Sequence, residues 1–211
     1  MAVTHRAQAG SNGPRHRERL LQLARERGVV RTRDLAALGV PRVYLRRLVA
    51  QGALERAGRG LYILAGFDVT EHHTLAEVGT KVPAGIVCLL SALAYHVIGT
   101  QLPHQVWLAI PMKARRPRVT DLPIRIVRFS GASLVAGVEP RRIEGVTVRI
   151  TNPARTVVDC FRFRNKIGLD VAVEALKEGW HDRRFTMDEL HEIATGLRSA
   201  KVIRPYLEML A

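Results

Sequence analysis

The sequence predicts an α+β protein of two domains, a small helical domain closed by a β-hairpin and a larger domain with a small mixed sheet and a helical tail. The length of 211 residues suits one or two domains of about 100–200 residues each. Hydrophobic residues make up 47% of the chain and charged residues 25%, as in ordinary globular proteins. Apolar positions follow a helical period at first, alternate in several later segments, and return to a helical period near the C-terminus.

Composition argues against a membrane-spanning or secreted protein. The longest apolar stretch, residues 86–99, contains Ser91, Tyr95 and His96 and is shorter than the roughly 20 residues that span a bilayer. The first 21 residues contain no apolar segment behind their positive charges, so they do not form a secretory signal. We therefore expect a cytoplasmic protein that does not enter a membrane.

No metal site or cofactor site is expected. Cys88 and Cys160 lie far apart in apolar contexts, which is typical of reduced, buried thiols and not of a disulfide framework. His72 and His73 are adjacent on an expected helix, where their side chains point about 100° apart, and no third ligand follows at helical spacing. The sequence thus predicts neither a bound metal ion nor a prosthetic group.

The positive charge is concentrated in the first third of the chain. The whole chain carries +14, and residues 1–66 contain 13 arginines and 4 acidic residues, a net charge of +9. Such a field attracts polyanions, of which nucleic acid is the commonest in the cytoplasm. Because the chain uses arginine far more than lysine, part of the excess can reflect genomic composition, so the arrangement of the charges has to decide.

Three short helices are expected after a flexible leader, residues 1–13. They span residues 15–27, 33–38 and 41–51, and a glycine follows each: Gly28, Gly39 and Gly52. Thr32 is expected to cap the second helix, and Pro41 suits the first position of the third. Only a tight turn separates the second and third helices.

A β-hairpin is expected next, with strands at residues 53–56 and 61–64 around a glycine-rich turn that has Arg59 at its tip. Three helices followed by a hairpin are the order of a winged helix-turn-helix, in which the third helix enters the major groove of DNA. The sequence therefore predicts a DNA-binding domain at residues 14–66.

The third helix has an apolar side and a basic side. On a helical wheel, Pro41, Leu45, Leu48 and Val49 cluster on the side that should be buried. The opposite side carries the residues expected to read bases: Val43, Arg46 and Arg47, with Ala50 beside them. Arginine pairs with guanine O6 and N7, and valine offers a contact to the thymine methyl group.

A second set of residues is placed to contact phosphates, which positions the domain and makes affinity fall with salt. Its members are Arg31, Thr32, Arg33, Arg42, Tyr44 and Arg59. For Tyr44 the sequence leaves an alternative open, in which the ring packs on the first helix.

Residues 67–211 are expected to form the second domain. Its first helix should begin after Thr70 as the N-cap, and another should begin at Thr151-Asn152-Pro153. Strands are expected at residues 86–90, 105–110, 124–129 and 146–150, and the other helices at residues 91–98, 168–178, 187–195 and 203–210. This pattern predicts a small mixed sheet followed by a helical tail.

A basic surface is possible on this second domain. A proline-broken loop carries Lys113, Arg115, Arg116 and Arg118, and the expected strands carry Arg125, Arg128 and Arg149, which should be exposed on one sheet face. The sequence leaves two interpretations open, a solvated face or a second surface that binds an anion or a partner.

The sequence contains no enzyme signature. A glycine-rich phosphate loop, a G-x-S-x-G motif and a Cys-x-x-Cys motif are all missing. Asp159 and Glu174 could form a carboxylate pair, but each is better explained by a neighbouring cation on its own helix, Arg155 for Asp159 and Lys177 for Glu174. We therefore expect a protein without catalytic residues.

Several motifs together resemble a known family. The first domain contains V-x-R-T-R-D-L-A-A-L-G-V, then Y-L-R-R-L-V-A-Q-G-A-L, then R-G-L-Y. The second contains Leu90-Ser-Ala-Leu-Ala-Tyr-His96, the loop R-R-P-R-V, and Thr151-Asn-Pro-Ala-Arg-Thr-Val-Val-Asp-Cys160. From about Arg15 onward, the sequence resembles the AbiEi family of antitoxins of type IV toxin–antitoxin systems.

The resemblance implies a bacterial repressor that takes part in abortive infection. It would bind inverted repeats of double-stranded DNA ahead of its own operon through the winged helix, and its C-terminal domain would counter a nucleotidyltransferase-like toxin, with or without direct contact. The chain would be a monomer when free, or a dimer on DNA. Two other hypotheses stay open: a ligand-responsive winged-helix regulator unrelated to a toxin, and an enzyme that processes nucleic acid.

Overall fold

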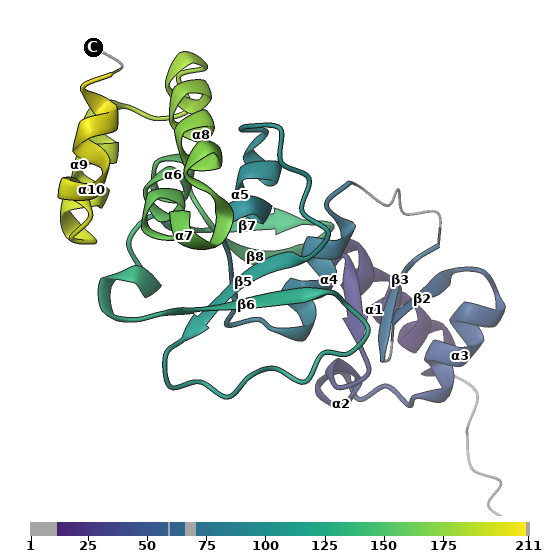
Figure 1. Ribbon diagram of the computed structural model, residues 1–211. Helices are drawn as coiled ribbons and strands as arrows, with labels where there is room; N and C mark the ends of the chain where they lie inside the picture. The colour runs from purple at the N-terminus through teal and green to yellow at the C-terminus, as the bar shows by residue number, and fades with distance from the viewer. Residues whose placement is uncertain (1–11, 59, 66–70, 210–211) are drawn as a thin grey trace, which may run out of the picture. The chain divides into compact units, whose positions relative to one another are not determined.

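The computed structural model describes residues 12–58, 60–65 and 71–209 (Figure 1). The chain divides into two compact units: residues 1–70 with residues 144–146, and residues 71–143 with residues 147–211. Both units contain helices and strands, so the expected α+β fold class is confirmed. No helix within the described ranges is long and apolar enough to cross a membrane.

The N-terminal unit is a winged helix (Figure 1). Its helices are α1 (Asn12–Arg27), α2 (Asp34–Leu38) and α3 (Val43–Ala50), and its strands are β1 (Val29–Arg31), β2 (Leu54–Gly58) and β3 (Leu61–Leu64). The strands form an antiparallel sheet in the order β1-β3-β2, so the short β1 extends the predicted hairpin. The core between the helices and the sheet contains Leu20, Ala24, Leu35, Leu45, Leu48 and Leu54.

The glycines end the helices as expected. Gly28, Gly39 and Gly52 have φ angles of 69°, 63° and 66°, a left-handed conformation that glycine adopts without the steric cost other residues pay. Helix α1 begins earlier than expected, at Asn12, so two residues assigned to the leader are helical. Residues 1–11 lie outside the described residues, as does the expected cap Thr70.

Two details of the helix-turn-helix differ from the prediction. Arg33, and not Thr32, occupies the N-cap position of α2. The Thr32 hydroxyl and backbone N–H both donate to the Gly60 carbonyl, at 3.2 and 2.9 Å, because β1 brings Thr32 beside the wing. Pro41 is exposed and not buried, since it lies in the turn before α3 begins at Val43.

The C-terminal unit is built on a five-stranded mixed sheet in the order β6-β5-β4-β8-β7 (Figure 1). The strands are β4 (Ile86–Val87), β5 (Val106–Pro111), β6 (Ile124–Phe129), β7 (Val138–Ile143) and β8 (Val146–Thr151). Strand β4 pairs antiparallel with β5 and parallel with β8, and β5 pairs parallel with β6. The sequence missed β7, whose Val138-Glu-Pro-Arg-Arg-Ile143 lacks the alternation of apolar and polar residues.

The helices of this unit are α4 (His73–Lys81), α5 (Leu89–His96), α6 (Pro153–Arg162), α7 (Arg164–Ile167), α8 (Leu169–His181), α9 (Met187–Gly196) and α10 (Ala200–Leu207), with a 3₁₀ turn, η1, at Gly131–Leu134. Helix α5 begins two residues before its expected start, which shortens β4 to two residues. Helix α10 begins three residues before its expected start, and the short α7 was not expected.

Helix α6 lies at the centre of this unit. Every residue of it from Ala154 to Phe161 is buried. It contacts α5, α8, α9 and α10 and shares one apolar core with the strands (Figure 1). A helix that is covered on all sides has no contact with water, so its polar and charged side chains need hydrogen-bond or ion-pair partners within the protein.

Replacing Val97 with glycine is expected to stabilise the C-terminal unit by about 1 kcal/mol. Val97 ends α5 in the left-handed conformation, with a φ of 54°, and its side chain is 65% exposed, so truncation loses little burial. Urea unfolding would measure the gain. Val135→Gly is the matched control, because Val135 is 74% exposed at a φ of −129° and should gain nothing. A loss of stability in Val97→Gly would contradict the prediction.

Candidate functional site

The outer face of α3 carries a row of exposed residues. Val43 is 47% exposed, and Arg46, Arg47 and Ala50 are also exposed. On the opposite side, Leu45 and Leu48 are buried in the core of the N-terminal unit. The predicted division of this helix into a basic face and an apolar face is confirmed.

Tyr44 connects this row to α1. Its ring is half-buried and meets the His16 ring edge-on, with centroids 5.0 Å apart. The Arg47 guanidinium carbon lies 5.4 Å from the centroid of the Tyr44 ring, a cation–π contact. The structure therefore shows the alternative in which the Tyr44 ring packs on the first helix. The same ring also contacts the guanidinium of Arg47.

Two arginines that the sequence analysis did not select flank the same face. Arg56 of β2 and Tyr62 of β3, which pair across the sheet, line a hollow of about 440 Å³ together with Arg46. Arg17 of α1 lines a second hollow, of about 300 Å³, together with Arg47. Tertiary packing brings both arginines beside α3, because Arg17 belongs to α1 and Arg56 to the hairpin.

The residues expected at phosphates lie at different places in the N-terminal unit. Arg33 and Arg42 are exposed at the N-cap positions of α2 and α3. Arg31 is half-buried, and its backbone N–H donates to the Asp34 carboxylate at 3.0 Å. Thr32 bonds to the wing, as described above, and Arg59 lies outside the described residues.

The basic loop of the C-terminal unit is exposed. Lys113, Arg115, Arg116 and Arg118 lie between β5 and β6, and these four side chains have no hydrogen-bond or ion-pair partner in the described part of the chain. Arg125 on β6 is also exposed, and its guanidinium lies 4.2 Å from the centroid of the Trp107 ring.

The expectation that Arg125, Arg128 and Arg149 share one exposed sheet face is wrong. Side chains alternate along β6, so Arg125 and Arg128 point to opposite faces. The Arg128 guanidinium donates to the carbonyls of Pro111, Met112 and Ala114, and Arg149 donates to those of Ala84 and Leu134. Both side chains thus hold backbone segments inside the unit.

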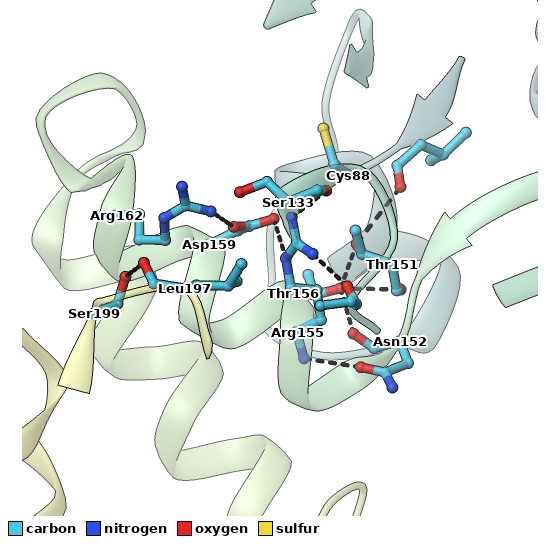
Figure 2. Close-up of polar contacts among 12 residues, drawn as sticks. Cys88, Ser133, Thr151, Asn152, Arg155, Thr156, Asp159, Arg162, Leu197 and Ser199 are labelled. Carbon is cyan, nitrogen blue, oxygen red and sulfur yellow. Dashed lines mark hydrogen bonds and ion pairs between the residues drawn. The ribbon is translucent and has the colours of Figure 1, made fainter. Parts of the chain in front are cut away.

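A fully buried ion pair lies on α6 (Figure 2). Arg155 and Asp159 are both 0% exposed, and Arg155 Nε donates to Asp159 Oδ2 at 2.9 Å. Arg155 Nη2 donates to the Ser133 carbonyl at 2.9 Å, and Nη1 donates to the Ala136 carbonyl. The expected pair is confirmed, and it ties α6 to the segment that contains η1.

Other polar residues at residues 151–162 form hydrogen bonds at the start of α6 and around Asp159 (Figure 2). The Asn152 side chain caps the helix by accepting from the Arg155 backbone N–H at 2.9 Å. The Thr156 hydroxyl lies 2.8 Å from the Thr151 hydroxyl and donates to the Asn152 carbonyl at 2.8 Å. Arg162 Nη1 donates to the other oxygen of Asp159, at 2.7 Å. These hydrogen bonds and ion pairs join the start of α6 to the end of β8 and hold the Asp159 carboxylate between two guanidinium groups.

Burial shifts the pKa of several side chains in this unit. Burial raises the pKa of Asp159, although Arg155 and Arg162 act in the opposite direction. Burial also raises the pKa of the free thiols of Cys88 and Cys160, as expected for inert buried cysteines. His96, the last residue of the Leu90–His96 motif, has its pKa lowered by burial, and its Nε2 lies 2.7 Å from the Thr151 carbonyl.

The fold is that of a winged helix with an exposed basic face on α3, followed in the chain by an α+β unit. Residues 18–65 match the model of a family described as transcriptional regulator, AbiEi antitoxin. The resemblance stated from the sequence motifs is thereby confirmed over this segment. The description of this family as transcriptional regulators and antitoxins supports a DNA-binding role for the matched segment.

The structure is also similar to that of the RV2827C protein from Mycobacterium tuberculosis. The TM-score is 0.54 at 17% sequence identity, and the match covers 97% of this chain and 81% of the other. At this identity the similarity concerns the fold, and it extends across both units. A search of curated proteins found no match. Among the described residues, no group of three or more His, Cys, Asp and Glu side chains could hold a metal ion.

Proposed function

We propose that this protein is an antitoxin that represses its own operon. Its winged helix binds inverted repeats in the operator with α3 in the major groove, and its C-terminal unit counters a nucleotidyltransferase-like toxin. The observation that carries the DNA-binding part is the exposed row of Val43, Arg46 and Arg47 on α3, opposite the buried Leu45 and Leu48. The match of residues 18–65 to the regulator and antitoxin family supports both parts.

The roles of the basic residues follow from their positions. Arg46 and Arg47 would read guanine, and Val43 would contact thymine methyl groups. Arg42, at the N-cap of α3, and Arg56, which lines a hollow with Arg46, would bind phosphates beside this face, and Arg33 would bind a phosphate at the N-cap of α2. Arg31, Thr32, Tyr44 and Arg59 remain proposed phosphate contacts, and Lys113, Arg115, Arg116, Arg118 and Arg125 a proposed secondary surface. Inverted repeats would pair two copies on DNA.

Arg47→Ala is expected to weaken binding to the upstream operator DNA by about 10-fold or more, corresponding to about 1–3 kcal/mol for one good base contact. Fluorescence anisotropy would compare the native upstream duplex with a scrambled duplex at fixed salt. The preference for the native duplex should fall in Arg47→Ala, while binding to the scrambled duplex changes little.

Arg25→Ala is the matched control, because it removes an exposed arginine from α1 and so changes the charge of the same unit equally. It should lower both affinities slightly and leave the preference unchanged. Equal binding of the native chain to both duplexes would contradict operator recognition.

The antitoxin part needs a separate test in cells that express the neighbouring toxin gene from an unrelated promoter. A full-length Arg46→Ala, Arg47→Ala chain should still rescue growth, because neutralisation is assigned to the other unit. Failure of the native chain to rescue growth would remove the antitoxin function while leaving the DNA-binding result intact.

A further inference from the structure

A hollow of about 730 Å³ lies where α8 ends and α9 begins, within the C-terminal unit. This volume is in the range of about 300–1,000 Å³ that is usual for small-molecule sites. Its lining residues are Lys177, Trp180, His181, Arg183, Phe185, Thr186 and Met187. Phe185 and Met187 also pack against the core around α6. The hydrogen bonds and ion pairs of the Arg155–Asp159 cluster use none of the lining side chains, so the hollow is separate from the buried ion pair.

The local sequence builds the floor of this hollow. Phe185 is 5% exposed and packs directly on the backbone of α8 at Gly179, where an added Cβ would lie 2.5 Å from the ring. Glycine is unfavourable inside a helix. It fits at position 179 because any side chain there would clash with the Phe185 ring. The turn after α8 is fixed by two hydrogen bonds, from Arg183 N to the Trp180 carbonyl at 3.1 Å and from Arg184 N to the Gly179 carbonyl at 2.9 Å.

The walls of the hollow combine an exposed aromatic ring with cations. Lys177, Trp180 and His181 are three and four residues apart, so they lie on one face of α8. Trp180 is 38% exposed, whereas the other tryptophan, Trp107, is 3% exposed. Lys177 and Arg183 are exposed, and neither has a hydrogen-bonded or ion-paired side chain among the described residues.

Three acidic side chains near these cations bind other groups. Glu174, which was expected to pair with Lys177, accepts hydrogen bonds from Thr100, and Glu178 accepts one from the Gly99 backbone N–H, at 2.9–3.2 Å. Glu189 is held in the capping box of α9 with Thr186. The lining itself therefore contains two fixed positive charges and no negative one.

We propose that this hollow binds a mononucleotide, with the base stacked on Trp180 and the phosphates held by Lys177 and Arg183. Stacking on an aromatic ring tolerates any base, and the two cations provide charge-assisted contacts to phosphate oxygens. The proposal does not depend on the toxin or the operator, and it gives the C-terminal unit a ligand-binding activity of its own.

The two tryptophans supply a direct test on the full-length chain. ATP, GTP and AMP would be titrated while tryptophan fluorescence is recorded, and stacking should quench the emission of Trp180. Trp180→Phe should abolish the quenching, because Trp107 is buried and out of reach. Lys177→Ala and Arg183→Ala should each weaken nucleotide affinity at least tenfold in calorimetry.

Arg198→Ala is the matched control. Arg198 and Arg183 are both exposed arginines that follow a helix in the left-handed conformation, with φ angles of 55° and 52°, but only Arg183 lines the hollow. The control should bind nucleotide like the native chain, and circular dichroism would show that all variants keep their helices.

Four outcomes would overturn the proposal. The first is no quenching at millimolar nucleotide, and the second is an equal loss of affinity in Arg198→Ala. The third is binding of inorganic tripolyphosphate as tight as that of ATP, which would mean that the hollow only attracts anions. Tighter binding of an acidic peptide than of any nucleotide would likewise reassign the hollow to a protein partner.

Discussion

Asp159→Asn is expected to destabilise the C-terminal unit by about 3–5 kcal/mol, the usual cost of removing one partner from a buried ion pair. The change keeps the shape of the side chain but leaves the guanidinium of Arg155, which is 0% exposed, without its counter-charge. Arg162 also loses its charged acceptor at 2.7 Å. Urea unfolding followed by the fluorescence of the buried Trp107 would measure the loss.

Two further variants make this prediction specific. Asp182→Asn removes an exposed carboxylate of the same unit and should change stability by less than about 0.5 kcal/mol, as surface substitutions usually do. The double variant Arg155→Met, Asp159→Leu removes both charges and should regain part of the loss, although the Ser133 and Ala136 carbonyls then lose their donor. If Asp159→Asn were as stable as Asp182→Asn, the ion pair would not hold this unit together.

Gly137→Ala is expected to cost about 2–4 kcal/mol, the sum of a left-handed backbone penalty and overpacking. Gly137 has a φ of 59°, and an added Cβ would lie 2.6 Å from Arg155 Cβ and 3.1 Å from Asn152 Oδ1. The Gly137 carbonyl also accepts from the Asn152 backbone N–H at 2.8 Å, so the segment cannot easily move away. Thermal unfolding would report the loss.

Gly131→Ala separates the two contributions. Gly131 has a φ of 52° in the same unit, and no atom lies within 4 Å of the position of its Cβ. It should therefore lose only about 1–2 kcal/mol, from the backbone conformation alone. Equal losses in the two variants would contradict the close packing of Gly137 against α6.

Local patterns in the sequence were enough to predict the winged helix and its basic face. The glycines at 28, 39 and 52 end three helices because only glycine adopts the left-handed conformation there without steric cost. The spacing of Leu45 and Leu48 put the arginines of α3 on the opposite, exposed side. The pair of Arg155 and Asp159 was also predictable, because residues four apart on a helix are neighbours.

Other features depended on contacts between residues far apart in the chain. Arg17 and Arg56 join the α3 face only because α1 and the hairpin pack beside it. Arg128 and Arg149, which alternation suggested were exposed, bind carbonyls of segments that the sequence could not place next to them. The hollow at Trp180 could likewise not be predicted from the sequence, because its floor forms only when Phe185 packs on Gly179.

The sequence by itself determined where the three helices of the winged helix end, which face of α3 is apolar and which charges share a helix, because these properties arise from interactions within a few residues. The tertiary structure alone decided which arginines are free to meet a ligand and which are bound to backbone. Whether a guanidinium is exposed or bound depends on carbonyls that the sheet order β6-β5-β4-β8-β7 and the packing around α6 bring to it, and these contacts span tens of residues.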